Sequence, residues 1–167
     1  EGDIVSLDAG LIYKGYHSDA ARTYTVGTVD PKVQQLVDVT KQSFFEGIKY
    51  AKAGGHLHDI SEAVQKYAES FGFGVVRDMV GHGIGTHLHE DPQIPNYKTI
   101  GRGIRLRPGM TLAIEPMITL GTWEGKTLED GWTYVTKDGK PAAHYENTIL
   151  ITEGEPEILT LPAGAVR

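Results

Sequence analysis

Two helix-like segments stand between two groups of strand-like segments, and this order constrains the fold of the 167-residue chain more than any other feature. Apolar residues recur at helical spacing in the middle segments, and short apolar runs bounded by turn residues mark the strands. Strands are predicted at 3–8, 16–26, 110–118 and 145–152, and helices from 31 to Gly54 and from 59 to Gly72. Helices grouped in this way between strands favour one mixed α+β domain.

The starts of both helices carry specific signals. Asp30 precedes Pro31, which matches a capping residue followed by proline at the first helical position. Asp59 is followed three residues later by Glu62, the spacing of a capping box. We therefore expect the first helix to begin at Pro31 and the second at Asp59.

The connections are rich in glycine. The 21 glycines among 167 residues are nearly twice the usual share of ~7%, and we expect them in turns and at close backbone approaches. A turn is predicted at Lys14-Gly15, another at 107–109, and a hairpin within 123–139. Segment 74–100 is expected to be mostly loop with short strands.

Composition excludes several classes of protein. The chain has 16 basic and 22 acidic residues, hence a net charge of −6, so no broad basic surface for nucleic acid or anionic membrane is expected. Cysteine is absent, which excludes disulfides, zinc–thiolate sites and a cysteine nucleophile, and fits a reducing compartment. No apolar run approaches the roughly 20 residues of a membrane helix. The chain starts at Glu1, without methionine, directly before a strand, as expected of a piece of a longer protein.

Two acids are predicted to meet on the first hairpin. If the chain turns at Lys14-Gly15, Asp8 lies opposite Ala21, and Asp19 is two residues from Ala21. Strand side chains repeat every two residues, so both carboxylates face the same side as near neighbours. A bound cation would remove their repulsion.

Two further acids interrupt apolar strands. Glu115 lies within 111–118 and Glu146 within 145–151, both otherwise largely apolar. An acid in such a strand must be paired, protonated or metal-bound. Few Arg or Lys residues lie near these strands, which favours metal binding over simple ion pairs.

Three histidines lie within eight residues of a glycine-rich segment, 81–92: His82, His87 and His89. They could be three metal ligands, or one ligand with substrate-binding groups beside it. The glycines of this segment lack the spacing of a nucleotide-binding loop. The remaining histidines are expected to have ordinary surface or core roles, with His17 near enough to Asp19 to assist it; these are His17, His56, His58 and His144.

Four carboxylates and one imidazole form an oxygen-rich set of potential ligands. Such a set selects divalent Mn, Fe, Co or Zn and is unlike a structural zinc site. Two such ions about 3.5–4 Å apart can activate a hydroxide and polarise a carbonyl. The sequence contains neither a G-x-S-x-G nor an H-E-x-x-H motif.

These residues resemble the five-ligand dinuclear site of type I, bacterial-like methionine aminopeptidases, and the resemblance extends along the chain to about residue 160. Each motif alone is weakly specific, but all of them in this order are highly specific. The matching segments are 6–10 (SLDAG), 16–19 (YHSD), 81–85 (GHGIG), 88–95 (LHEDPQIP), 110–116 (MTLAIEP) and 130–133 (DGWT).

The resemblance implies the pita-bread fold, a curved antiparallel sheet with helices on its outer face, here lacking the family's N-terminal part. Asp8 would bind one metal ion, and His82 and Glu115 the other. Asp19 and Glu146 would bridge the two ions. Residues 1–160 would form the catalytic domain and 161–167 a C-terminal tail.

The implied activity is removal of the initiator methionine from nascent polypeptides by a metal-activated hydroxide. Glu115 would also shuttle a proton, and His89 would hydrogen-bond the substrate. Leu88 and Trp132 would line the methionine pocket. The implied protein is a cytoplasmic monomer that acts on peptide or nascent-chain N-termini near the ribosome and binds no nucleic acid directly and no membrane. The chain alone is expected to be inactive unless another chain supplies the missing part.

Two alternatives remain at this point. A prolidase or Xaa-Pro aminopeptidase has the same fold and ligands, but glycine is expected after the Glu-Pro pair and arginine shortly before the last glutamate. Here Met117 follows Glu115-Pro116, and His144 precedes Glu146. A non-catalytic pita-bread module that binds peptides is the other alternative, although such relatives usually lose ligands.

Overall fold

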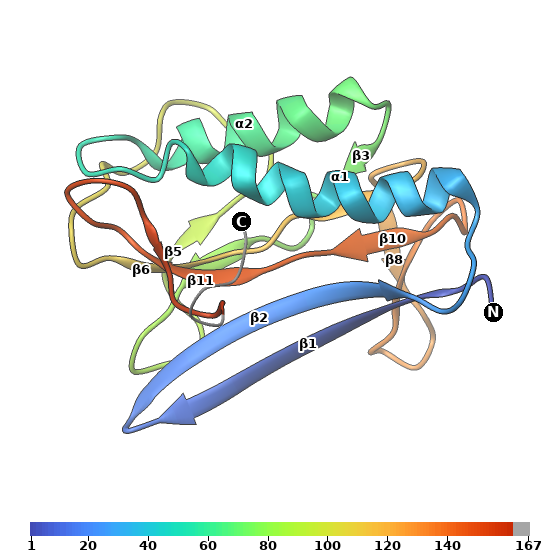
Figure 1. Cartoon of the computed structure of the whole chain (residues 1–167), viewed down its shortest axis with the longest axis horizontal. Helices are drawn as coiled ribbons and strands as arrows, with labels where there is room; N and C mark the ends of the chain where they lie inside the picture. Colours follow the sequence, from blue (N-terminus) through green and yellow to red (C-terminus); the bar gives the residue numbers. More distant parts are fainter. Residues whose placement is uncertain (162–167) are drawn as a thin grey trace.

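The computed structural model describes residues 1–161, in which two helices lie together on one side of the strands (Figure 1). Neither described helix combines the length and apolar character needed to cross a membrane. The elements are β1 (Ile4–Tyr13), β2 (Tyr16–Thr25), α1 (Pro31–Ile48), α2 (Leu57–Ser70), β3 (Gly74–Val75), β4 (Gly81–Gly83), β5 (Glu90–Ile94), β6 (Thr111–Ile114), β7 (Met117–Thr119), β8 (Gly125–Thr127), β9 (Tyr134–Thr136), β10 (Ala142–His144), β11 (Asn147–Leu150) and β12 (Glu157–Ile158).

The first hairpin confirms the predicted turn and register. Lys14 and Gly15 both have positive φ, 51° and 83°, as a two-residue hairpin turn of the primed type requires. Asp8 pairs with Ala21, as predicted, and Asp19 pairs with Gly10. β1 runs on to Tyr13, further than the predicted end at residue 8, because the pairing with β2 continues to the turn.

Helix α1 begins as predicted. Pro31 is its first residue, and the side chain of Asp30 accepts a hydrogen bond from the backbone N–H of Lys32. Its buried side chains include Leu36 and Phe44, which belong to apolar clusters shared with strand residues. The helix thus buries the apolar stripe that predicted it.

Helix α2 begins at Leu57, so the predicted start at Asp59 and its capping box are wrong. The N–H of Leu57 donates to the carbonyl of Ile104 at 3.0 Å, so a neighbouring loop satisfies the first turn. Asp59 instead binds the guanidinium of Arg102 at 2.6 Å, and Glu62 pairs with lysines. A tertiary contact therefore replaces the local cap.

The predicted strands 110–118 and 145–152 are each broken in two. β6 and β7 are separated by Glu115-Pro116, and β10 and β11 by Tyr145-Glu146. Proline has no N–H for a strand ladder, and the backbone of Glu146 exchanges hydrogen bonds with Ala21 of β2. Both segments therefore cross from one sheet to another, and one of the two glutamates lies at each crossing.

All strand pairs in the described residues are antiparallel, but the expected curved sheet is divided into four hydrogen-bonded sheets. Their strand orders are β1-β2, β10-β7-β3, β12-β11-β6-β4-β5 and β8-β9. The predicted hairpin within 123–139 is the β8–β9 pair.

Two apolar clusters join the helices to the sheets. One contains Phe44 and Leu112, and the other contains Leu36 and Ile118. Both helices cover one side of the strands, away from the β1–β2 hairpin (Figure 1). The prediction that the helices pack on one face and carry none of the five candidate ligands is confirmed.

Candidate metal centre

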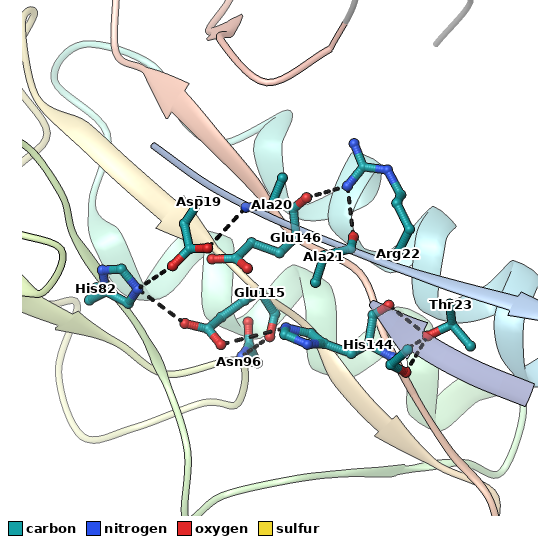
Figure 2. Close-up of polar contacts among 11 residues, drawn as sticks. Asp19, Ala20, Ala21, Arg22, Thr23, His82, Asn96, Glu115, His144 and Glu146 are labelled. Carbon is teal, nitrogen blue, oxygen red and sulfur yellow. Dashed lines mark hydrogen bonds and ion pairs between the residues drawn. The ribbon is translucent and has the colours of Figure 1, made fainter. Parts of the chain in front are cut away.

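Asp19, His82 and Glu146 converge from three separate elements. They come from β2, from β4 and from the break between β10 and β11. One potential ligand atom of each lies within 4.8 Å of the others, and all three residues are buried. Figure 2 shows the two carboxylates and the imidazole pointing toward a common space.

Glu115 joins this group from the break between β6 and β7. Its Oε1 lies 3.6 Å from His82 Nε2, and Asp19 Oδ2 lies 3.9 Å from the same nitrogen. His82 Nδ1 lies 2.9 Å from the carbonyl oxygen of Gly83, which can only accept a hydrogen bond. The proton therefore belongs on Nδ1, which leaves the Nε2 lone pair directed at the carboxylates.

Asp8 completes the acidic group from the more exposed strand β1. Its charge contributes to the raised pKa of Asp19 and of Glu146, so its carboxylate lies near both. Asp8 and Glu115 also line a cavity of about 310 Å³. The structure thus brings the five predicted residues to one region, while their roles as ligands remain a prediction.

The acids carry an electrostatic cost in the absence of a cation. Burial, followed by repulsion from Glu115, Asp19 and Asp8, raises the pKa of Glu146 to about 9. Burial and the charge of Asp8 likewise raise the pKa of Asp19. Glu146 Oε1 is buried without a hydrogen-bond partner among the described residues. A buried cluster of carboxylates with one oxygen left unpaired fits a divalent metal ion.

A comparison with known protein families agrees with a site that fits a divalent metal ion. Residues 1–153 match metallopeptidase family M24. The chain belongs to this family. A crystal structure of methionine aminopeptidase from Thermotoga maritima aligns with a TM-score of 0.94 at 56% identity, over 97% of this chain and 65% of that one. A prolidase from Pyrococcus furiosus aligns with a TM-score of 0.74 at 27% identity, over 96% and 42%. The fold is therefore the predicted pita-bread fold.

Curated M24 relatives are similar in sequence as well. A methionine aminopeptidase of Clostridium acetobutylicum is 56% identical over 161 residues, and methionine aminopeptidase 1 of Bacillus subtilis is 52% identical over 160. Each match covers 96% of this chain and 64% of the relative. The chain thus spans somewhat less than two thirds of the length of these relatives.

The three clustered histidines of this M24 chain have different surroundings. His82 faces the acids, and the ring of His89 lies against it with centroids 4.4 Å apart at an angle of 73°. His87 is exposed, and its Nδ1 lies 3.6 Å from Glu90. One inward histidine with a second beside it fits the single-ligand alternative better than three ligands.

The two residues expected to line a methionine pocket differ in their surroundings. Leu88 is half-buried, and its side chain lies over Gly10 of β1, which is the pairing partner of Asp19. Trp132 lies in the turn between β8 and β9 and is 89% exposed. The structure therefore brings Leu88 toward the site and leaves Trp132 uncovered.

Sequence reasoning missed Arg22. Its guanidinium donates to the backbone carbonyls of Glu146 and, at 2.7 Å, Ala21, and to Asn147 Oδ1 at 2.6 Å. It also lies 4.3 Å from the centroid of the Tyr145 ring. The charge of Arg22 opposes the rise in the pKa of Glu146. A cation three residues after Asp19 on the same strand was the available signal.

His144, predicted to have an ordinary role, is the second residue that was missed. Its Nε2 lies 3.6 Å from Glu115 Oε2 and has no hydrogen-bond partner among the described residues. Its position two residues before Glu146 was the only signal in the sequence.

Proposed function

We propose that the chain carries the catalytic residues of a methionine aminopeptidase, which removes the initiator methionine from nascent polypeptides. The observation that most supports this is the convergence of Asp19, His82 and Glu146 within 4.8 Å, with Glu115 beside His82. Residues 1–160 would be the catalytic domain. The tail predicted at 161–167 lies, from 162 onward, outside the described residues.

The proposed ligands are the five acidic and imidazole groups of the site, which would hold two divalent ions such as Co, Mn, Fe or Zn. When bound, such ions act as Lewis acids toward a carbonyl and lower the pKa of water. The orphaned Glu146 Oε1 and the raised pKa values of Glu146 and Asp19 support this fit. The residues are Asp8, Asp19, His82, Glu115 and Glu146.

Two residues have proposed roles in proton transfer and charge stabilisation. Glu115, at the edge of the cavity, would take a proton from the attacking water and deliver it to the leaving amine. His89 would donate a hydrogen bond to the scissile carbonyl oxygen, where negative charge develops. The contact of its ring with that of His82 supports this placement.

The substrate would bind in the cavity of about 310 Å³ beside Asp8 and Glu115. Its walls include the apolar side chains of Val76, Met79 and Met117 as well as the two acids. A lining of apolar side chains and carboxylates suits the first residues of a peptide with its free α-amino group. Leu88 and Trp132 would contact the methionine side chain, as the family resemblance implies.

The proposed setting is the cytoplasm, with the protein acting as a monomer on the N-termini of peptides or nascent chains near the ribosome. Net charge −6 and the absence of cysteine support this setting, since they fit a reducing compartment and no extended nucleic-acid surface. Bacterial relatives named methionine aminopeptidase also support it.

Prolidase activity is the second candidate. Prolidase structures share the fold, but the prolidase of Pyrococcus furiosus is 27% identical, against 56% for the methionine aminopeptidase of Thermotoga maritima. Met117 and His144 also stand where glycine and arginine were expected for a prolidase. These differences favour the methionine-specific activity.

Release of methionine from a Met-Gly-Met peptide in the presence of Co²⁺ or Mn²⁺ tests the proposal. The chain would be assayed alone and mixed with the part of the Clostridium acetobutylicum relative that it does not match. Release that disappears in His82→Ala supports the proposal. Release from an Xaa-Pro peptide instead favours a prolidase, and binding of metal and peptide without hydrolysis in either mixture favours a non-catalytic module.

A further inference from the structure

The carboxylate of Glu115 lies between two histidines. Its Oε1 is 3.6 Å from His82 Nε2, and its Oε2 is 3.6 Å from His144 Nε2. Figure 2 shows the two imidazoles approaching this carboxylate from opposite sides. One oxygen therefore faces the candidate metal centre, and the other faces His144.

His144 is held in place by three strands. It ends β10, where it pairs with Met117 of β7. The hydroxyl of Thr23, on β2, accepts from the His144 N–H at 2.9 Å and donates to the His144 carbonyl at 2.8 Å. The imidazole is thus presented to Glu115 from a fixed backbone.

The pair is also mostly buried, beside the cavity that both residues line. The side chains of His144 and Glu115 are 16% and 14% exposed, and His144 Nε2 is buried without another partner within residues 1–161. An ionised carboxylate can only accept hydrogen bonds, whereas a neutral imidazole can donate from Nε2. Closing the 3.6 Å separation to the ~2.7–3.2 Å of a hydrogen bond needs only a small side-chain rotation.

We infer that His144 is a positioning residue: it donates from Nε2 to Glu115 Oε2 and so sets which carboxylate oxygen faces the metal ion. The inference rests on the proposed function, because it assigns Glu115 to the metal centre. Hydrogen bonds of this kind orient a ligand, and their loss typically weakens metal binding 10–100-fold.

Metal affinity of the purified chain tests the inference. Co²⁺ would be titrated into the unsubstituted chain, His144→Gln, His144→Leu and the control His58→Leu, and binding followed by visible absorbance. His144→Leu, which removes the donor, should weaken binding about 10–100-fold. His144→Gln, which keeps an N–H donor, should stay within about threefold, and so should the distant His58→Leu. Unchanged affinity in His144→Leu overturns the inference.

A second readout needs neither metal nor activity. In the metal-free chain, NMR should detect a slowly exchanging Hε2 proton of His144, assigned by its loss in His144→Gln. In Glu115→Gln this proton should shift and exchange faster, because its carboxylate acceptor is gone. An Nε2 without a proton, or a signal that Glu115→Gln leaves unchanged, overturns the inference.

The two proposals fail separately. If peptide hydrolysis is never observed, the proposed function fails, while the Hε2 signal and its response to Glu115→Gln still support the role of His144. If hydrolysis occurs but His144→Leu binds Co²⁺ normally, the inference fails and the proposed function stands.

Discussion

Glu146 is 1% exposed, yet its Oε1 has no hydrogen-bond partner among the described residues. Burial and the nearby carboxylates raise its pKa to about 9, and Arg22 only partly offsets this. A buried acid under such repulsion reduces the stability of the metal-free fold. At the scale of single residues, the grouped carboxylates thus lower the stability of the metal-free chain, and the same grouping favours binding of a cation.

Neutralising Glu146 should stabilise the metal-free chain. Near pH 8 the folded chain holds Glu146 mostly protonated, whereas the unfolded chain leaves it ionised, because its pKa rises from 4.5 to about 9 on folding. Glutamine is neutral in both states and avoids this cost, so the free energy of unfolding in EDTA should rise by on the order of 1 kcal/mol or more. The same variant should no longer gain stability from Co²⁺. Urea denaturation measures both effects, and Glu129→Gln on an exposed residue is the control. A loss of stability in EDTA would contradict the electrostatic account.

His82 and His89 should respond differently to substitution. His82→Ala should lose metal, since its Nε2 faces the acids. His89→Ala should keep its metal and lower kcat by ~10²–10³, because only a donor to the substrate is removed. Metal analysis and peptide kinetics, in a preparation that hydrolyses the peptide, separate the two. Normal turnover in His89→Ala would disprove its donor role, and equal metal loss would disprove the distinction between the two histidines.

At the scale of elements, the two strand breaks create the site. β6 pairs with β11 and β7 with β10, so Glu115-Pro116 and Tyr145-Glu146 cross between the sheets side by side. The backbone of Glu146 then bonds to Ala21, which brings β2 and its Asp19 alongside. If β10 and β11 formed one unbroken strand, the backbone groups of Glu146 would pair within a sheet and could not bond to β2.

Arg22 should be the main stabiliser of the contact between β2 and the second break. Arg22→Leu removes hydrogen bonds to Glu146 and Asn147, so we expect a loss of about 2–4 kcal/mol in the free energy of unfolding. Arg22→Lys should restore only part of it, because an ammonium cannot make the forked contacts. Urea denaturation measures the effect, with exposed Arg107→Leu as the control expected to lie within about 0.5 kcal/mol. Full restoration by lysine would contradict the geometric argument.

At the scale of the whole molecule, the helices cover one side of the strands (Figure 1), and the β1–β2 hairpin supplies two residues of the candidate metal centre, Asp8 and Asp19. β1 is hydrogen-bonded only to β2 among the described residues, and it exposes Leu7 and Leu11. Asp8 therefore comes from the least covered strand of the site, whereas His82 and Glu146 come from buried segments.

The stability of the metal-free chain should fall as pH rises from about 4.5 to about 9. Glu146 has a pKa near 9 when folded and 4.5 as its ordinary value, so the folded chain holds more protons in this range. The stabilising protonation is fully present below 4.5 and is lost as pH passes 9. Surface acids whose pKa is lowered, such as Asp59 and Asp138, change the stability of the fold only at pH values below their ordinary pKa of 3.8.

A saturating divalent metal should reverse this trend, because metal binding requires deprotonated ligands. Denaturation midpoints across the same pH range, in EDTA and in Co²⁺, check both signs. A metal-free chain whose stability rises with pH would contradict the raised pKa of Glu146.

Part of the fold could be predicted because its causes are local. The Lys14-Gly15 turn determines the hairpin register that sets Asp8 opposite Ala21, and Asp30-Pro31 determines the start of α1. The start of α2 could not be predicted, since the partner of its first N–H is Ile104, 47 positions away in the chain, and no local cap is needed.

The sequence by itself determined which residues are candidates for the metal centre, because acids within apolar segments must find a partner wherever those segments are buried. Only the tertiary structure decided how they meet: Glu115 and Glu146 lie at breaks between strands, and Arg22 and His144 contact them from other strands. The positions of Arg22 and His144 near Asp19 and Glu146 did not identify their roles, since these roles arise from backbone carbonyls and a carboxylate contributed by distant segments. Such contacts exist only once the sheets have packed together.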